Sequence, residues 1–155
     1  MPSTEIEKQY NDLRKKHRLP DFREIDCELE AKDLEETSFL LRAIARRIAE
    51  KLEFYTTMLE ELLQPDTKLY AMHESKFFED DDKKKMYGLY KKLMALSRQS
   101  IEAFLQADER EEANFINGFI SEWKKIKIEI MPYVRRMKDS WTTETDTKED
   151  LGYLG

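Results

Sequence analysis

The stretch 33–65, DLEETSFLLRAIARRIAEKLEFYTTMLEELLQP, decides the fold of this chain. Its apolar residues recur at steps of three and four, at Leu41, Ile44, Ile48, Leu52, Tyr55, Leu59 and Leu62. That spacing places them along one side of an α-helix, which we expect to run from about Asp33 to Leu63. Pro65 ends the helix, because a proline disfavours helical geometry in the residue before it. A helix with one apolar side must bury that side against other elements.

Two further stretches have the same periodicity and predict two more long helices. One of them is expected from about Glu79 to Gln106, with its apolar stripe at Met86, Tyr90, Leu93, Ser97, Ile101 and Phe104. The other is expected from about Glu109 to Trp141, with its apolar stripe at Phe115, Phe119, Trp123, Ile126, Ile130, Val134 and Met137. Pro132 lies inside the last helix and removes one backbone donor, so we expect a kink or a break there.

Short helices are expected before and between the long ones. Ser3 or Thr4 caps a first short helix, and Asp21 with Glu24 resembles a capping box that opens a second. The segment 66–78 is expected to hold one helical turn. The fold class is therefore all-α, an antiparallel helical bundle of three long helices plus one or two short N-terminal helices.

The composition agrees with one helical domain in a reducing compartment. Charged residues make up 39% of the 155 residues, while Gly and Pro number four each, which favours long helices with solvated faces. We predict a single domain over 1–141 and a flexible acidic tail over 142–155. One cysteine, a polar N-terminus and the lack of a long apolar run predict a cytoplasmic protein without a membrane partner. The abundance of Lys and Glu over Asn and Gln is thermophile-like.

Some apolar residues lie off the main stripes of the long helices. They are Phe54, Met58, Ile116, Ile120 and Ile128. One explanation is that the short N-terminal helices cover them. The other is that they form the interface of a homodimer, which is the hypothesis that we carry forward.

Basic residues gather in 42–51 and 122–138, although the net charge of the chain is −6. A basic helical face could follow the phosphates of RNA. The candidate RNA-binding residues are Arg42, Arg46, Lys124, Lys127, Arg135 and Arg136. A ribosome or another ribonucleoprotein is a candidate partner, whereas the overall acidity and the lack of a helix-turn-helix pattern argue against DNA. The alternative is an ordinary solvated face with exposed ion pairs.

Four carboxylates form the best candidate for a catalytic site. Glu60 and Glu61 are followed after a short connection by Glu79 and Asp82, and helical carboxylates can hold Mg²⁺. This spacing resembles the acidic pattern of the all-α, MazG-like nucleotide pyrophosphohydrolases. The resemblance implies a Mg²⁺-dependent hydrolase, with Gln64 in the place of the third acid of the family.

No other motif points to catalysis. The two histidines, His17 and His73, are far apart, and the chain has no glycine-rich phosphate loop. We therefore expect no cofactor and no catalytic residue. The preferred hypothesis is a non-enzymatic helical interaction protein, homodimeric and associated with a ribonucleoprotein, with the pyrophosphohydrolase as the alternative.

Overall fold

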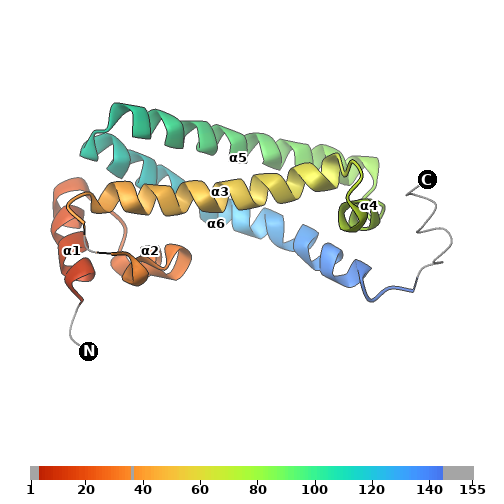
Figure 1. Ribbon diagram of the computed structural model, residues 1–155, viewed down its shortest axis with the longest axis horizontal. Helices are drawn as coiled ribbons and strands as arrows, with labels where there is room; N and C mark the ends of the chain where they lie inside the picture. The colour runs from red at the N-terminus through yellow and green to blue at the C-terminus, as the bar shows by residue number, and fades with distance from the viewer. Residues whose placement is uncertain (1–3, 36, 145–155) are drawn as a thin grey trace. The chain divides into compact units, whose positions relative to one another are not determined.

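The structure, a computed structural model, describes residues 4–35 and 37–144, which form helices joined by short connections (Figure 1). The helices are α1 (Glu5–His17), α2 (Phe22–Leu29), α3 (Leu40–Leu63), α4 (Leu69–Ser75), α5 (Asp80–Gln106) and α6 (Glu109–Ser140), with a 3₁₀ turn at Ala31–Asp33. Its described residues form no strand, which confirms the all-α class. The predicted tail 142–155 lies largely outside the described residues.

The helix ends confirm one predicted cap and correct another. Thr4 is the N-cap of α1, and its hydroxyl accepts the backbone N–H of Glu7 at 3.1 Å. Asp21 is the N-cap of α2, but its side chain makes no capping hydrogen bond, so the predicted capping box is absent. The connection 66–78 holds a seven-residue helix, α4, instead of a single turn.

The first long helix is shorter than its periodicity suggested. α3 begins at Leu40 and not near Asp33, because residues 31–33 form a separate 3₁₀ turn and Leu34 is extended. The Thr37 hydroxyl accepts the backbone N–H of Phe39 at 3.1 Å, a local bond that competes with helical hydrogen bonding. At the other end of the chain, α6 continues through Pro132, so of the predicted kink or break the break is excluded, and the kink stays a prediction.

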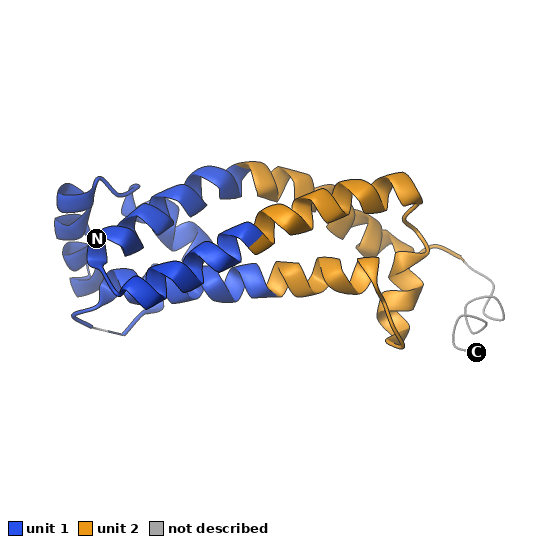
Figure 2. Cartoon of the chain, turned by 90° about the horizontal axis from the view of Figure 1, so that it is seen from above, with its two compact units in different colours: residues 1–53, 95–124 blue, residues 54–94, 125–155 orange. Residues whose placement is uncertain are grey.

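The chain divides into two compact units, which Figure 2 shows in different colours. Unit 1 comprises residues 1–53 and 95–124, and unit 2 comprises residues 54–94 and 125–155. Each of α3, α5 and α6 contributes to both units, while α1 and α2 belong to unit 1 and α4 to unit 2. The single domain over 1–141 stays a prediction.

Each unit has an apolar core supplied by the long helices. In unit 1 the side chains of Ile44, Ile48 and Phe119 are fully buried, and Tyr10 of α1 packs its ring 5.4 Å from that of Phe22. The Tyr10 hydroxyl donates to the carbonyl of Pro20 at 2.6 Å, and burial raises its pKa well above the usual value. In unit 2 the buried residues include Leu59, Leu62, Met86, Leu89 and Ile130.

One predicted stripe is wrong in its phase. The residues of α5 that are buried are Met86, Leu89, Leu93, Leu96, Ser100 and Ala103. Of the predicted set, Tyr90, Ser97 and Phe104 are only half-buried, and Ile101 is 47% exposed. Two stripes with the same spacing lie side by side on α5, and periodicity alone does not say which one the neighbouring helices cover.

Candidate interaction surfaces

The predicted homodimer residues separate into a buried pair and an accessible set. Ile116 and Ile120 of α6 are buried in unit 1, so their assignment to an interface is wrong, because the fold of the single chain already covers them. In unit 2, Phe54 is 65% exposed and Ile128 is 75% exposed. Met58, one helical turn after Phe54, is half-buried. These three residues remain available to a partner.

Each accessible apolar residue has a second apolar side chain close by on its own helix. Phe54 and Met58 are four residues apart on α3, and the ring of Phe54 also packs edge-on against Tyr55 at 5.1 Å. On α6, Met131 follows Ile128 by three residues and is 42% exposed. Residues three or four apart share a helix face. Unit 2 therefore has an apolar pair on α3 and another on α6.

Among the candidate RNA-binding residues, Arg42, Lys124 and Arg136 form ion pairs within the chain. In unit 1, Arg42 Nε lies 3.1 Å from the buried carboxylate of Glu112, and Lys124 Nζ lies 2.5 Å from Glu24. In unit 2, Arg136 lies 3.0 Å from Asp82, and its side chain also donates to the carbonyl of residue 77. A guanidinium or ammonium bound to a carboxylate has less charge to offer a phosphate.

The remaining candidates, Arg46, Lys127 and Arg135, are exposed. Arg46 lies in unit 1 with Arg42, whereas Lys127 and Arg135 lie in unit 2. Arg46 lines a shallow hollow at the start of α3, and the carboxylates of Asp33 and Glu35 line it too. Arg42 and Arg47 line the same hollow, so both signs of charge meet there.

The carboxylates of the predicted magnesium site do not converge. Within residues 4–35 and 37–144, no group of three or more His, Cys, Asp or Glu side chains is arranged to hold a metal ion. Glu60 and Glu79 are exposed, and Glu61 accepts hydrogen bonds from Lys68 at 2.5 Å and from Tyr70 at 2.6 Å. These bonds, with that from Lys68 the stronger, hold the pKa of Glu61 below its usual value.

The fourth carboxylate, Asp82, also has partners of its own. It accepts the backbone N–H of Glu79 at 3.0 Å and lies 3.0 Å from Arg136, and both interactions lower its pKa. Glu61 and Asp82 thus each neutralise a nearby cation. The convergence of carboxylates that the pyrophosphohydrolase resemblance implies is absent from the described residues, and that function stays a prediction.

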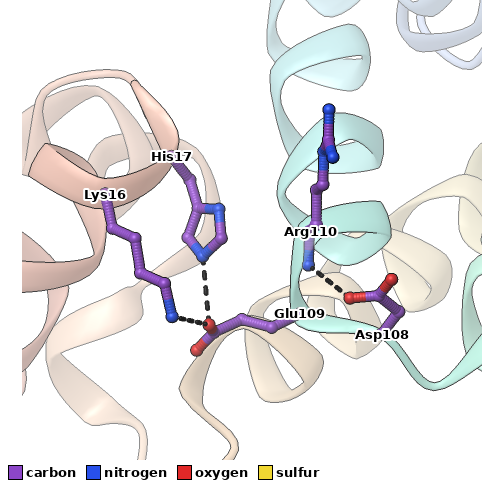
Figure 3. A network of polar contacts seen from close by, with 5 residues as sticks. All are labelled: Lys16, His17, Asp108, Glu109 and Arg110. Atoms are coloured by element: carbon purple, nitrogen blue, oxygen red, sulfur yellow. Dashed lines mark hydrogen bonds and ion pairs between the residues drawn. The ribbon is translucent and has the colours of Figure 1, made fainter.

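Sequence reasoning missed a polar network that joins α1 to α6 in unit 1. Figure 3 shows Glu109, the first residue of α6, reaching toward the end of α1. Its carboxylate lies 3.0 Å from Lys16 Nζ and 3.0 Å from His17 Nε2, and these hydrogen bonds lower the pKa of Glu109. Beside it, Asp108 accepts the backbone N–H of Arg110 at 3.0 Å and caps the helix (Figure 3). His17 therefore has a structural role.

A second network in unit 1 centres on Glu28 of α2. Its carboxylate accepts a hydrogen bond from the indole of Trp123 at 2.8 Å and lies 3.4 Å from Lys51. The Lys51 ammonium also lies 5.1 Å from the centre of the Trp123 ring, a cation–π distance. Because Glu28 and Trp123 are 95 positions apart in the sequence, no local sequence pattern predicts their contact.

In unit 2 the other histidine holds the end of α6 against α4. His73 Nε2 lies 3.0 Å from the carbonyl of Ser140, and its ring lies 4.2 Å from that of Trp141. The Trp141 indole donates to the buried carboxylate of Glu74 at 3.0 Å. These contacts account for His73 and Glu74 as structural groups.

Comparisons with known proteins add no assignment. No protein-family model matches the chain, and neither the curated proteins nor the solved structures contain a match. Among the described helices, none combines the length and the apolar character needed to cross a lipid bilayer.

Proposed function

We propose that this chain is a non-enzymatic helical protein that binds another protein, in the first place a second copy of itself, through exposed apolar side chains of unit 2. The observation that carries the proposal is the exposure of Phe54 and Ile128, at 65% and 75%. Each has an apolar neighbour one turn away, Met58 or Met131. Apolar side chains that cluster on a surface lose their contact with water when a partner covers them.

A second copy is the partner that such residues suit best. An interface around a two-fold axis places the same patch of each copy against the other, and apolar patches need no charge complementarity to do so. A stable dimer buries about 800 Å² per partner, so the residues around both pairs must contribute as well. A ribonucleoprotein partner has weaker support, because Arg42, Lys124 and Arg136 are bound to carboxylates.

The test is the molar mass of the chain in solution, measured by light scattering during size exclusion over a range of concentrations. We expect a dimer for the unmodified chain. Phe54→Lys and Ile128→Lys, made separately and together, should shift it toward the monomer. Leu105→Lys is the matched control, because Leu105 is 82% exposed and belongs to neither pair.

Two results decide the proposal. A monomer at every concentration, or a dimer that all three variants leave intact, would contradict self-association through these residues. Sedimentation of a cell lysate with and without ribonuclease tests the ribonucleoprotein partner separately. Migration of the chain with heavy particles that ribonuclease disperses would support that partner instead.

A further inference from the structure

α5 carries a second apolar stripe beside the one that is buried. Tyr87, Tyr90 and Met94 follow each other at steps of three and four, and in unit 2 they reach the surface. Tyr87 is 54% exposed, and Tyr90 and Met94 are half-buried. The same spacing continues along the helix at Ile101 and Phe104. Apolar residues at these steps form the seam along which two helices pack in a coiled coil.

The outer flank of this stripe is basic. Lys84 and Lys91 are exposed and seven residues apart, which places them on one line of the helix with Tyr87 between them. The Lys91 ammonium lies 5.9 Å from the centre of the Tyr87 ring. Residues 83–101 hold six Lys or Arg and no Asp or Glu, although the whole chain has a net charge of −6. One of the six, Lys92, pairs with Glu129 of α6 at 3.1 Å, while Lys84 and Lys91 lie on the outward face. This stretch therefore has the charge that an acidic partner requires.

We propose that the outward face of α5, formed in unit 2 by Lys84, Tyr87, Tyr90, Lys91 and Met94, binds an acidic amphipathic helix of another protein. The apolar residues of that helix pack against Tyr87, Tyr90 and Met94. Its flanking Glu or Asp residues recur every seven positions and pair with Lys84 and Lys91, as charges beside a coiled-coil seam do.

The combination of lysines and apolar side chains favours a helix over a polyanion that has no apolar groups. A polyanion would pair with the lysines but would gain little from Met94, which is half-buried and apolar. A helix uses the apolar stripe and the cations together, because its own side chains have the same repeat. The proposal is independent of self-association, which rests on Phe54 and Ile128.

The test uses the full chain and a labelled synthetic peptide of about four heptads, with Leu at the seam and Glu on the flanks. Binding is followed by fluorescence anisotropy at low and at moderate salt. We expect the acidic peptide to bind and a version with Lys in place of Glu not to bind. K84E/K91E should weaken binding about tenfold, because two favourable pairs become repulsive.

A matched variant separates a specific site from general attraction between opposite charges. Lys8 and Lys15 of α1 are also exposed and seven residues apart, so K8E/K15E changes the net charge by the same amount. This variant should retain the affinity of the unmodified chain. No binding of the acidic peptide, or equal losses in the two charge variants, would overturn the proposal. Circular dichroism establishes that each variant is folded.

A second double variant tests the contribution of the apolar side chains to peptide binding. Tyr87→Ser with Met94→Ser leaves both lysines in place and should weaken peptide binding at least as much as the charge reversal does. A single-stranded oligonucleotide and phosphatidylserine vesicles serve as polyanion probes. The helix proposal fails if two results are found together. The first is that the oligonucleotide or the vesicles bind the unmodified chain as tightly as the peptide does. The second is that the serine variant binds the peptide, the oligonucleotide and the vesicles as tightly as the unmodified chain does, which would make the face a polyanion surface.

Discussion

The buried ion pair between Arg42 and Glu112 gives a prediction whose size follows from its geometry. The Glu112 side chain is only 5% exposed, and the Arg42 side chain is 29% exposed. Arg42 also lies 4.7 Å from the centre of the Phe39 ring. Replacing Arg42 with methionine keeps much of its apolar length but leaves the carboxylate buried without its cation. Replacing Glu112 with leucine leaves a cation that can turn toward water.

The two single variants should therefore have unequal costs. An uncompensated buried charge costs about 3–5 kcal/mol, and the positive end of α6 near Glu112 offsets up to ~1 kcal/mol of this for the carboxylate. We expect Arg42→Met to lower the free energy of unfolding by about 2–4 kcal/mol and Glu112→Leu by about 1 kcal/mol. The double variant should cost less than Arg42→Met alone, because it leaves no charge unpaired.

The measurement is urea unfolding of the four proteins, followed by circular dichroism at neutral pH. The double-mutant cycle then gives the coupling between the two side chains, which we expect to be about 2 kcal/mol. A coupling below about 0.5 kcal/mol, the range of exposed pairs, would refute the reasoning. So would a larger cost for Glu112→Leu than for Arg42→Met.

Three further predictions concern stability. Gly88→Ala and Gly118→Ala should each stabilise the chain by about 0.5–1 kcal/mol, because both glycines lie inside helices and a Cβ there meets no atom within 4 Å; an unchanged or lower melting temperature would contradict this. Ala107→Gly should add about 1 kcal/mol, because Ala107 has a φ of 51° after the end of α5, and urea unfolding measures the gain. The hydrogen bonds that Glu109 accepts from α1 lower its pKa in the folded chain below the usual 4.5. These bonds therefore contribute fully to the free energy of unfolding at pH values above 4.5, and the contribution is lost as the pH falls through the lowered pKa. Glu109→Gln should thus destabilise the chain near pH 7 and have less effect in acid; an effect independent of pH would contradict the assignment.

The sequence predicted the exposure of some candidate interface residues but not of others. The exposure of Phe54 and Ile128 agrees with their position off the main stripes, because a helical residue opposite a buried side tends to face water. Ile116 and Ile120 each follow a residue of the α6 stripe, Phe115 or Phe119, by one position, so they lie nearer to that stripe than Ile128 does, and both are buried. Their position on the helix therefore agrees with burial at the edge of a wide apolar side, which the hypothesis of a dimer interface did not take into account.

Counts of charge along the chain also did not predict which acids and bases pair with each other. Glu60 and Glu61 are adjacent to each other in the chain, but Glu61 turns to Lys68 and Tyr70, and Asp82 turns to Arg136. A carboxylate in a chain with 33 acids and 27 bases has many cations within reach. Its partner is chosen by three-dimensional proximity, so counts of charge along a segment do not predict it.

By itself, the sequence determined the helical class, the three long helices and most of their ends. Those features depend on local chemistry, such as the periodicity of apolar residues, Pro65 after α3 and the hydroxyl of Thr4 before α1. Only the tertiary structure decided which stripe of α5 is buried and that Arg42 meets Glu112, 70 residues away. These outcomes depend on which faces the neighbouring helices cover, since burial against a neighbour selects between two stripes that are equivalent along the chain.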